Sequence, residues 1–156
     1  MLFRSAAIGQ LAERYGDVDF VYPVHMNPSV AGPAHKRLAQ YENVHLHEPL
    51  PYPDFVGLMK RAHLILTDSG GLQEEAPSLG VPVLVMRETT ERPEAVAAGF
   101  ARLVGTDPDR IVAEASRLLD NCDEARGALS AKANPFGDGL AGKRIVAAVT
   151  AAASVV

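Results

Sequence analysis

The chain has 156 residues, the length of one ordinary domain, and 47% of them are hydrophobic, which is enough to build a buried core. Its net charge of −4 argues against a nucleic-acid surface or a membrane-binding patch, and no apolar run reaches membrane-spanning length. A single cysteine, Cys122, excludes an internal disulfide and fits a reducing compartment. The opening residues lack the apolar core of a signal peptide, so we expect a cytoplasmic protein.

Helix and strand patterns alternate from residue 2 to residue 62. Apolar side chains at four-residue spacing predict helices, and short apolar runs bounded by polar residues, Gly or Pro predict strands. In chain order, the predicted elements are helix 2–15, strand 19–25, helix 31–41, strand 43–49 and helix 53–62. Pro33 is expected near the first turn of the second helix, and Asp54 is expected to cap the third.

The same alternation continues to the end of the chain. The elements are strand 63–67, helix 71–80, strand 81–86, helix 92–99, strand 101–105, helix 108–120, a shorter helix to about 132, and a last helix from about 140. Near-continuously apolar strands that alternate with helices indicate a parallel sheet covered on both faces, which is a doubly wound α/β fold. Ligands of such sheets bind beyond the carboxyl ends of the strands, so the loops that follow strands are candidate sites.

The loop after the third predicted strand, in the segment TDSGGLQEE, combines two glycines with a hydroxyl and two carboxylates. Gly70 and Gly71 allow a sharp turn, and free N–H groups at the start of a helix attract anions. Ser69 adds a hydroxyl, so a phosphate or diphosphate is the expected guest. Glu75, about one turn further on, can accept hydrogen bonds from the two adjacent hydroxyls of a ribose. In the structural alternative, Asp68 or Ser69 caps the helix, and the glutamates complement its dipole.

A cation occupies an unusual position in the segment RETTERPEAV. Pro93 suits the first position of a helix, which leaves Arg92 at or near the N-cap. A positive charge at that end of a helix is unfavourable unless an anion lies opposite. Glu88 and Glu91 are local partners in one interpretation, and a bound nucleotide diphosphate is the partner in the other.

An aromatic side chain and a histidine are further candidates at the same edge of the sheet. Phe55 is positioned to stack on a planar base, although an aromatic at helical spacing more often belongs to the core. His25 ends its strand at the functional edge and is a candidate site residue. His45 and His47 share a strand face, but no carboxylate or cysteine completes a metal set, so we expect no metal site.

Three segments together closely resemble the non-hydrolysing UDP-N-acetylglucosamine 2-epimerases. They are YPVHMNP at 22–28, the block from LILTDSGG to AVAAG at 64–99, and NPFGDG at 134–139. The resemblance extends from about Asp19 to Val149. It implies a Rossmann-like domain that is the C-terminal half of a two-domain GT-B-like fold, with a UDP-sugar bound between the domains. It also implies interconversion of UDP-N-acetylglucosamine and UDP-N-acetylmannosamine, by elimination and re-addition of UDP.

The resemblance also implies roles for single residues. Its UDP site comprises Leu50, Phe55, Ser69, Gly70, Gly71, Glu75 and Arg92. The serine and the glycines hold the diphosphate, the glutamate holds the ribose, the phenylalanine packs on the uracil, and the leucine offers backbone groups. In family members under allosteric control, the histidine that matches His25 touches a second UDP-sugar. The resemblance assigns no catalytic residue and no cofactor to this chain.

The sequence departs from the family's pattern at its start. The family's C-terminal domain begins with a strand ending in a His-Arg-Arg-Glu-Asn-like motif, whereas this chain begins inside the helix that follows. The N-terminal domain, which supplies the family's acid and base carboxylates, has no counterpart. The NPFG segment replaces the commoner Asn-Pro-Tyr-Gly and so lacks one hydroxyl. We therefore expect residues 1–156 to be the UDP-binding C-terminal domain, without its first strand and inactive alone.

Two alternatives stay open: the C-terminal half of a UDP-sugar glycosyltransferase, which shares the architecture, and a free-standing module that binds a UDP-sugar. The expected partners are UDP-N-acetylglucosamine or UDP, the N-terminal domain, and further copies of the chain in a homo-oligomer. Neither a nucleic acid nor a membrane is an expected partner.

Overall fold

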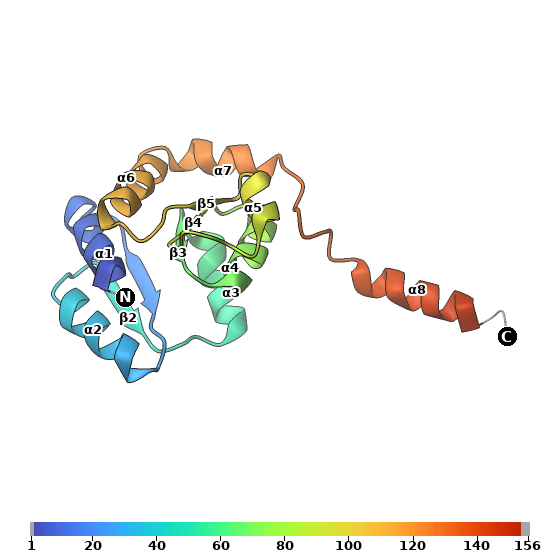
Figure 1. Cartoon of the computed structure of the whole chain (residues 1–156), viewed down its shortest axis with the longest axis horizontal. Coiled ribbons are helices and arrows are strands. Elements are labelled where there is room, and N and C mark those ends of the chain that lie inside the picture. The colour runs from blue at the N-terminus through green and yellow to red at the C-terminus, as the bar shows by residue number, and fades with distance from the viewer. Residues whose placement is uncertain (1, 154–156) are drawn as a thin grey trace.

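The computed structural model describes residues 2–153, which form two small parallel sheets surrounded by helices (Figure 1). The first sheet holds β1 and β2, which pair in parallel with Phe20 opposite Val44. The elements of this half, in chain order, are α1 (Leu2–Arg14), β1 (Phe20–Pro23), α2 (Pro28–Leu38), β2 (Val44–His47) and α3 (Tyr52–Arg61).

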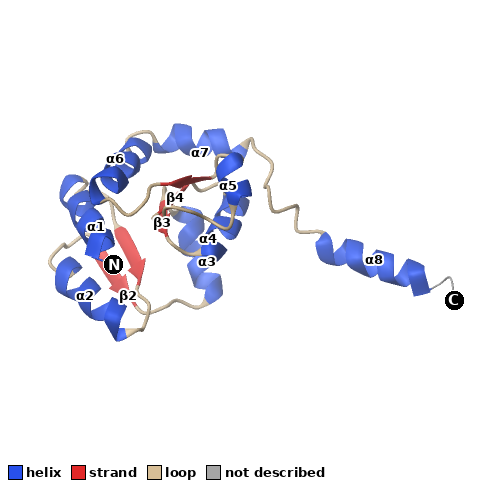
Figure 2. Ribbon diagram, in the orientation of Figure 1, coloured by secondary structure: helices blue, strands red, loops and turns tan. Residues whose placement is uncertain are grey.

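The second sheet has three parallel strands in the order β3-β4-β5, with Ile65 opposite Val83 and Val83 opposite Ala101. The elements of this half are β3 (Ile65–Thr67), α4 (Gly70–Glu75), the 3-10 helix η1 (Ala76–Leu79), β4 (Val83–Val85), α5 (Pro93–Ala97), β5 (Ala101–Leu103), α6 (Pro108–Leu119), α7 (Cys122–Ser130) and α8 (Ala141–Ala153). The predicted α/β class with parallel strands is confirmed, and Figure 2 shows the strands enclosed by helices.

Helices cover both faces of the three-stranded sheet. On β4, Val83 and Val85 are buried on the side of α3, η1 and α5, in the same apolar cluster as Met59. Leu84 points to the opposite face, where it packs in a cluster with Ile111 of α6 and with residues of α1. Because all three β4 side chains are buried, the strand reads as a continuous apolar run, as expected for a parallel sheet with two covered faces.

The predicted sheet is divided, because among residues 2–153 β1 pairs only with β2 and β3 pairs only with β4. The N–H groups of Phe20 and Ile65 donate to the partner strands, to the carbonyls of Asn43 at 2.8 Å and Pro82 at 3.0 Å. In a parallel ladder the next residue along points its backbone groups the other way, so Val21 on β1 and Leu66 on β3 turn theirs away from their partners. Among residues 2–153, the edges of β1 and β3 that face away from β2 and β4 thus have no paired strand.

Helix α1 holds the two sheets together. Its residues Ala7 and Leu11 pack in the apolar cluster of the three-stranded sheet, and Ile8 and Ala12 pack in the cluster of β2 and α2. The side chain of Phe20 on β1 contacts both clusters. One helix therefore spans the seam between the sheets and buries apolar side chains on each side of it.

The predicted start of the second helix is wrong. The helix α2 begins at Pro28, because the side-chain oxygen of Asn27 accepts a hydrogen bond from the N–H of Ser29 at 3.0 Å and so caps the first turn. Pro33 consequently lies inside the helix and not in its first turn. The Asn-Pro pair ahead of the predicted start is the signal for this boundary.

The predicted cap of the third helix is also wrong. The helix α3 begins at Tyr52, with Pro51 as its N-cap residue and Pro53 in its first turn. Asp54 therefore lies within the first turn, where its negative charge complements the helix dipole but its side chain does not cap the helix.

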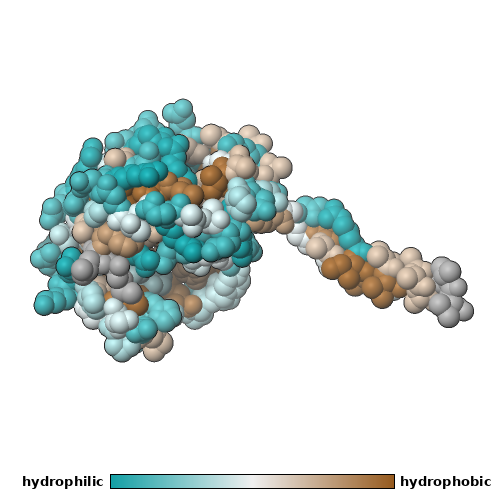
Figure 3. Space-filling model, viewed as in Figure 1, coloured by the Kyte–Doolittle hydropathy of each residue, from teal (hydrophilic) through white to brown (hydrophobic). Residues whose placement is uncertain are grey.

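Helix α8 projects from the body of the molecule, as Figure 1 shows, and none of its residues is buried. Ile145, Val146 and Val149 on this helix are 62%, 63% and 62% exposed. They form part of the brown apolar surface that Figure 3 shows along the projecting helix. Within residues 2–153, no helix is both long and apolar enough to cross a membrane.

Candidate functional site

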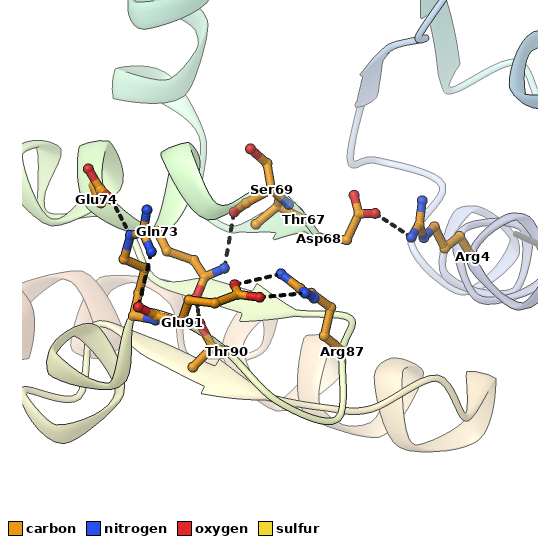
Figure 4. Close-up of polar contacts among 10 residues, drawn as sticks. Arg4, Thr67, Asp68, Ser69, Gln73, Glu74, Arg87, Thr90 and Glu91 are labelled. Atoms are coloured by element: carbon orange, nitrogen blue, oxygen red, sulfur yellow. Dashed lines mark hydrogen bonds and ion pairs between the residues drawn. The ribbon is translucent and has the colours of Figure 1, made fainter. Parts of the chain in front are cut away.

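The turn that follows β3 carries Ser69, Gly70 and Gly71 at the carboxyl edge of the three-stranded sheet (Figure 4). Ser69 is the N-cap residue of α4, but its side chain makes no capping hydrogen bond. Its backbone N–H donates instead to the buried hydroxyl oxygen of Thr67, at 2.9 Å. Because no side chain caps the helix, the N–H groups of its first turn stay open to a ligand.

The structural alternative for this turn is therefore not the one that the chain adopts. The carboxylate of Asp68 forms an ion pair with Arg4 of α1, across from the turn, and does not cap α4 (Figure 4). Tyr22 of β1 lies near this pair, and burial, together with the charge of Asp68, raises its pKa. The Arg4–Asp68 pair thus joins the start of α1 to the end of β3.

Three polar side chains surround the two glycines. A side-chain carbon added to Gly70 would lie 3.9 Å from Nη2 of Arg92. One added to Gly71 would lie 3.8 Å from Oγ of Ser69 and 3.9 Å from Oε1 of Glu75. A guanidinium, a hydroxyl and a carboxylate therefore converge on the bare backbone of the turn. The residues predicted to hold the diphosphate and the ribose thus lie in one place.

Arg92 is the N-cap residue of α5, as predicted, but the carboxylates of Glu88 and Glu91, its partners in one interpretation, are engaged elsewhere. Its Nε donates to the carboxylate of Glu74 on α4, and its Nη1 donates to the backbone carbonyl of Glu91 at 3.0 Å. The carboxylate of Glu91 is held by two hydrogen bonds from Arg87, which lower its pKa, and Glu88 accepts from the loop after β5. The anion opposite Arg92 thus comes from a different element, and packing rather than local sequence supplies it.

Glu75 lies half-buried beside Gly71, and one of its oxygens accepts a hydrogen bond from the hydroxyl of Tyr52 at 3.3 Å. The charge of this carboxylate is the main reason that the pKa of Tyr52 is raised. The contact also places the start of α3 next to the glycine turn. Tyr52 has no predicted role, and its position two residues after Leu50 supports the prediction that this stretch borders the site.

The two remaining predicted contacts of the UDP site come from α3 and the loop before it. Leu50 lies in that loop and is partly buried. Phe55 is partly buried and packs against the apolar cluster that includes Met59 and Ile65. Phe55 therefore belongs in part to the core, which is one of its two predicted roles. Its contact with a base stays a prediction.

His25 belongs to the other sheet. It follows β1 on the two-stranded sheet, is exposed, and its Nδ1 accepts a hydrogen bond from the N–H of Asn27 at 3.1 Å. His45 contacts Asp19, with 2.8 Å between Nε2 and the carboxylate oxygen. Within the described part of the chain, no three His, Cys, Asp or Glu side chains gather to hold a metal ion.

Gln73 and Thr90 have no predicted role, yet they connect the two loops of the site. Gln73 is fully buried, its Nε2 donates to the carbonyl of Ser69 at 3.1 Å, and its Oε1 accepts from the hydroxyl of Thr90. In the sequence, Gln73 stands three residues before Ala76, so the two share one helix face. That face is buried in the structure, which makes Gln73 a polar residue in an apolar position.

Comparisons with known proteins relate this chain to one family of enzymes. A family model described as UDP-N-acetylglucosamine 2-epimerase matches residues 3–150. A probable UDP-N-acetylglucosamine 2-epimerase from Ralstonia nicotianae is 58% identical over 146 residues, which are 94% of this chain and 39% of that protein. The UDP-N-acetylglucosamine 2-epimerase of Escherichia coli K12 is 56% identical over 92% of this chain and 38% of its own length. The chain thus spans about two fifths of the length of these relatives.

Solved structures match over nearly the whole chain. A UDP-N-acetylglucosamine 2-epimerase from Neisseria meningitidis, bound to UDP-N-acetylglucosamine, superposes with a TM-score of 0.85 at 45% identity, over 96% of this chain and 41% of that one. The MnaA protein of S. aureus, in a co-structure with UDP, has a TM-score of 0.91 at 40% identity, over 100% of this chain and 42% of its own. Both kinds of comparison therefore match nearly the whole of this chain to about two fifths of each relative.

Proposed function

The chain belongs to the UDP-N-acetylglucosamine 2-epimerase family, and from that premise we propose that residues 1–156 form the C-terminal, UDP-binding domain of such an enzyme. The share of the relatives that the chain spans, 39% of the R. nicotianae protein, supports a partner domain outside this sequence. The unpaired edges of β1 and β3 support a further parallel strand between the two sheets. In our proposal the strand is the first strand of this C-terminal domain, and the partner is the N-terminal domain of the complete enzyme.

The observation that carries the proposal is the convergence on the glycine turn. The diphosphate of UDP binds the open N–H groups of Gly70 and Gly71, with the hydroxyl of Ser69 on one side and the guanidinium of Arg92 near the other. Glu75, whose Oε1 lies beside Gly71, accepts hydrogen bonds from the ribose hydroxyls. The matched structures from N. meningitidis and S. aureus contain UDP-N-acetylglucosamine and UDP, which supports a nucleotide site in this chain.

The uracil occupies the side of the site that is formed by α3 and the loop before it. Leu50 offers backbone groups to the base, and Phe55 packs against it with the part of its ring that the core leaves uncovered. The hydrogen bond between Tyr52 and Glu75 supports this placement, because it ties the start of α3 to the ribose end of the site. We propose that His25 contacts a second UDP-sugar, which is the role that the resemblance implies for the matching histidine of family members under allosteric control.

In the complete enzyme, UDP-N-acetylglucosamine and UDP-N-acetylmannosamine interconvert by elimination of UDP and its re-addition. Inversion at C2 requires one group to remove a proton from one face and another to return a proton on the opposite face. Glu74 and Glu75 are engaged by Arg92 and Tyr52 at the nucleotide end of the site. The acid and the base therefore come from the N-terminal domain, and this chain supplies the grip on UDP.

Location and assembly complete the proposal. The chain works in the cytoplasm, where its one cysteine, Cys122, stays reduced, and it forms a homo-oligomer with further copies of the complete enzyme. Its partners are UDP-N-acetylglucosamine or UDP and the N-terminal domain. The net charge of −4 supports the expectation that neither a nucleic acid nor a membrane is among them.

The test is proton exchange at C2, followed by NMR in deuterated water. The pure chain, incubated with UDP-N-acetylglucosamine, is expected to bind UDP in a calorimetric titration but to introduce no deuterium at C2. A separately expressed N-terminal domain of a close relative, extended by the strand that precedes α1, is expected to restore exchange. Exchange by the chain alone would place the catalytic pair within residues 1–156. Binding without exchange, even after the domain is added, would favour the free-standing binding module.

A further inference from the structure

Gln73 is a fully buried amide whose two polar atoms are both satisfied. Its Nε2 donates to the carbonyl of Ser69 at 3.1 Å, and its Oε1 accepts from the hydroxyl of Thr90 (Figure 4). A buried amide is tolerated in a protein interior only where such partners are present. These two bonds therefore fix the side chain between the glycine turn and the loop that precedes α5.

The bond to Ser69 acts on the N–H group that the ligand needs. The carbonyl of Ser69 and the N–H of Gly70 belong to one planar trans peptide unit, in which they point in opposite directions. Because Gln73 holds the carbonyl, it also sets the direction of the Gly70 N–H. Thr67 fixes the preceding peptide in the same way, through its hydrogen bond from the Ser69 N–H at 2.9 Å.

The hydroxyl of Thr90 extends the link to the cation of the site. It donates to Gln73 and accepts from the backbone N–H of Arg92 at 3.0 Å. The side chain next to Gln73 in the sequence, Glu74, holds the guanidinium of the same arginine. Adjacent residues of α4 thus control both the backbone and the side-chain end of Arg92.

We propose that Gln73 and Thr90 form a clamp that sets the distance between the Ser69–Gly71 turn and Arg92, so that both meet one diphosphate. This inference rests on the proposed function, in which the turn and Arg92 hold the diphosphate of UDP. Gln73 and Thr90 are positioning residues, because they act through the groups that touch the ligand. A pre-organised site loses less conformational entropy when the ligand binds, which is how the clamp strengthens binding.

The test compares UDP and inorganic pyrophosphate as ligands of the 156-residue chain in calorimetric titrations. Thr90→Val removes the hydroxyl and keeps the shape of the side chain. Gln73→Met removes both hydrogen bonds of the side-chain amide with little change of volume. Each is expected to weaken UDP and pyrophosphate alike, by roughly 3- to 30-fold. Thr90→Ser, which keeps the hydroxyl, is expected to bind both ligands within about twofold of the parent chain.

A double-mutant cycle separates positioning from a general structural effect. If the clamp acts through Arg92, Thr90→Val is expected to cost little further affinity in a chain that already carries Arg92→Ala. Full additivity of the two losses would overturn the proposal. Ser116→Ala is the matched control, because this buried hydroxyl lies on α6, outside the site, and it is expected to leave both affinities unchanged.

The outcomes also separate the clamp from the function on which it rests. Failure of the folded parent chain to bind UDP or pyrophosphate would overturn the proposed function and the clamp with it. Normal binding by the parent chain, with unchanged affinities in folded Thr90→Val, would overturn the clamp alone. Circular dichroism reports folding, and if Gln73→Met does not fold, Thr90→Val, in a partly exposed loop position, decides the question.

Discussion

At the scale of single residues, the glycine turn is available to an anion because its neighbours occupy the other polar groups around it. Thr67 takes the N–H of Ser69, and Gln73 takes the carbonyl of the same residue. Asp68, the acidic side chain nearest the turn in sequence, is neutralised by Arg4. An unpaired carboxylate at Asp68 would add repulsion against a diphosphate. The local arrangement therefore leaves donors open and pairs Asp68 with a cation.

The ribose role of Glu75 predicts a selective loss of affinity. Glu75→Ala is expected to weaken UDP about 10- to 100-fold, because hydrogen bonds to a charged acceptor are lost, while pyrophosphate affinity stays unchanged. Calorimetric titration with both ligands measures the two effects. Glu94→Ala, an exposed carboxylate on α5, is the control and is expected to change neither. Equal losses for UDP and pyrophosphate would contradict the ribose role.

The ion pair between Arg92 and Glu74 changes the expected effect of Arg92→Ala on the stability of the free protein. From the sequence, a cation at a helix N-cap is unfavourable and its loss would stabilise the free protein. In the structure Glu74 offsets that charge, and both side chains are partly exposed, at 35% and 43%. Arg92→Ala is therefore expected to lower the free energy of unfolding slightly, by about 0.2–1 kcal/mol, and less in high salt. Urea unfolding at two salt concentrations tests this, and a gain in stability would show that the helix dipole dominates.

At the scale of elements, α1 connects the two sheets, which in an undivided sheet would be connected by a strand between them. It packs on the clusters of both sheets, and its Arg4 reaches the end of β3. The backbone of β1 makes no ladder to β3, so side-chain packing under α1 is what joins the two halves. The stability of the body should therefore depend strongly on apolar contacts of this helix.

Leu11 of α1 is fully buried between the sheets, so its substitution measures how much the contacts of α1 contribute to stability. Leu11→Ala is expected to lower the free energy of unfolding by about 2–5 kcal/mol, because apolar transfer energy is lost and a cavity remains. Leu140→Ala removes the same atoms from a side chain that is 42% exposed and is expected to cost far less. Urea denaturation of the two variants makes the comparison. Similar losses for both would contradict the central place of α1.

At the scale of the whole molecule, apolar side chains are exposed on a sheet edge and on the projecting helix. The edges of β1 and β3 have no strand partner among residues 2–153, and Val21 on β1 is 37% exposed. Helix α8 presents three more exposed apolar side chains. Unpaired strand edges recruit other chains, so natural proteins normally cover or charge them.

We therefore expect the isolated chain to self-associate, with an apparent mass that rises with concentration in light scattering. Val21→Lys is expected to reduce the association, because a charged side chain on an edge strand discourages pairing. Val146→Lys on α8 reports the contribution of the projecting helix separately. A stable monomer at high concentration would refute the prediction.

The sequence alone determined the features that depend on neighbours along the chain. Apolar runs and helical spacing predicted the alternation of strands and helices, and α6 begins at Pro108 as predicted, with Asp107 as its cap. The turn at Ser69 and the carboxylate of Glu75 lie six residues apart, so one strand-to-helix turn suffices to bring them together. Short-range spacing of this kind is fixed by backbone geometry, which is why it can be read without a fold.

Only the tertiary structure decided which groups from distant elements meet. Arg92 pairs with Glu74, 18 residues away, and not with the glutamates beside it, and Arg4 pairs with Asp68 across 64 residues. The division of the sheet into two parts, and the burial of Gln73 against Thr90, likewise depend on how helices pack on strands. Such contacts depend on the distance between elements in space, which neither the spacing of residues nor the local propensity of a segment contains.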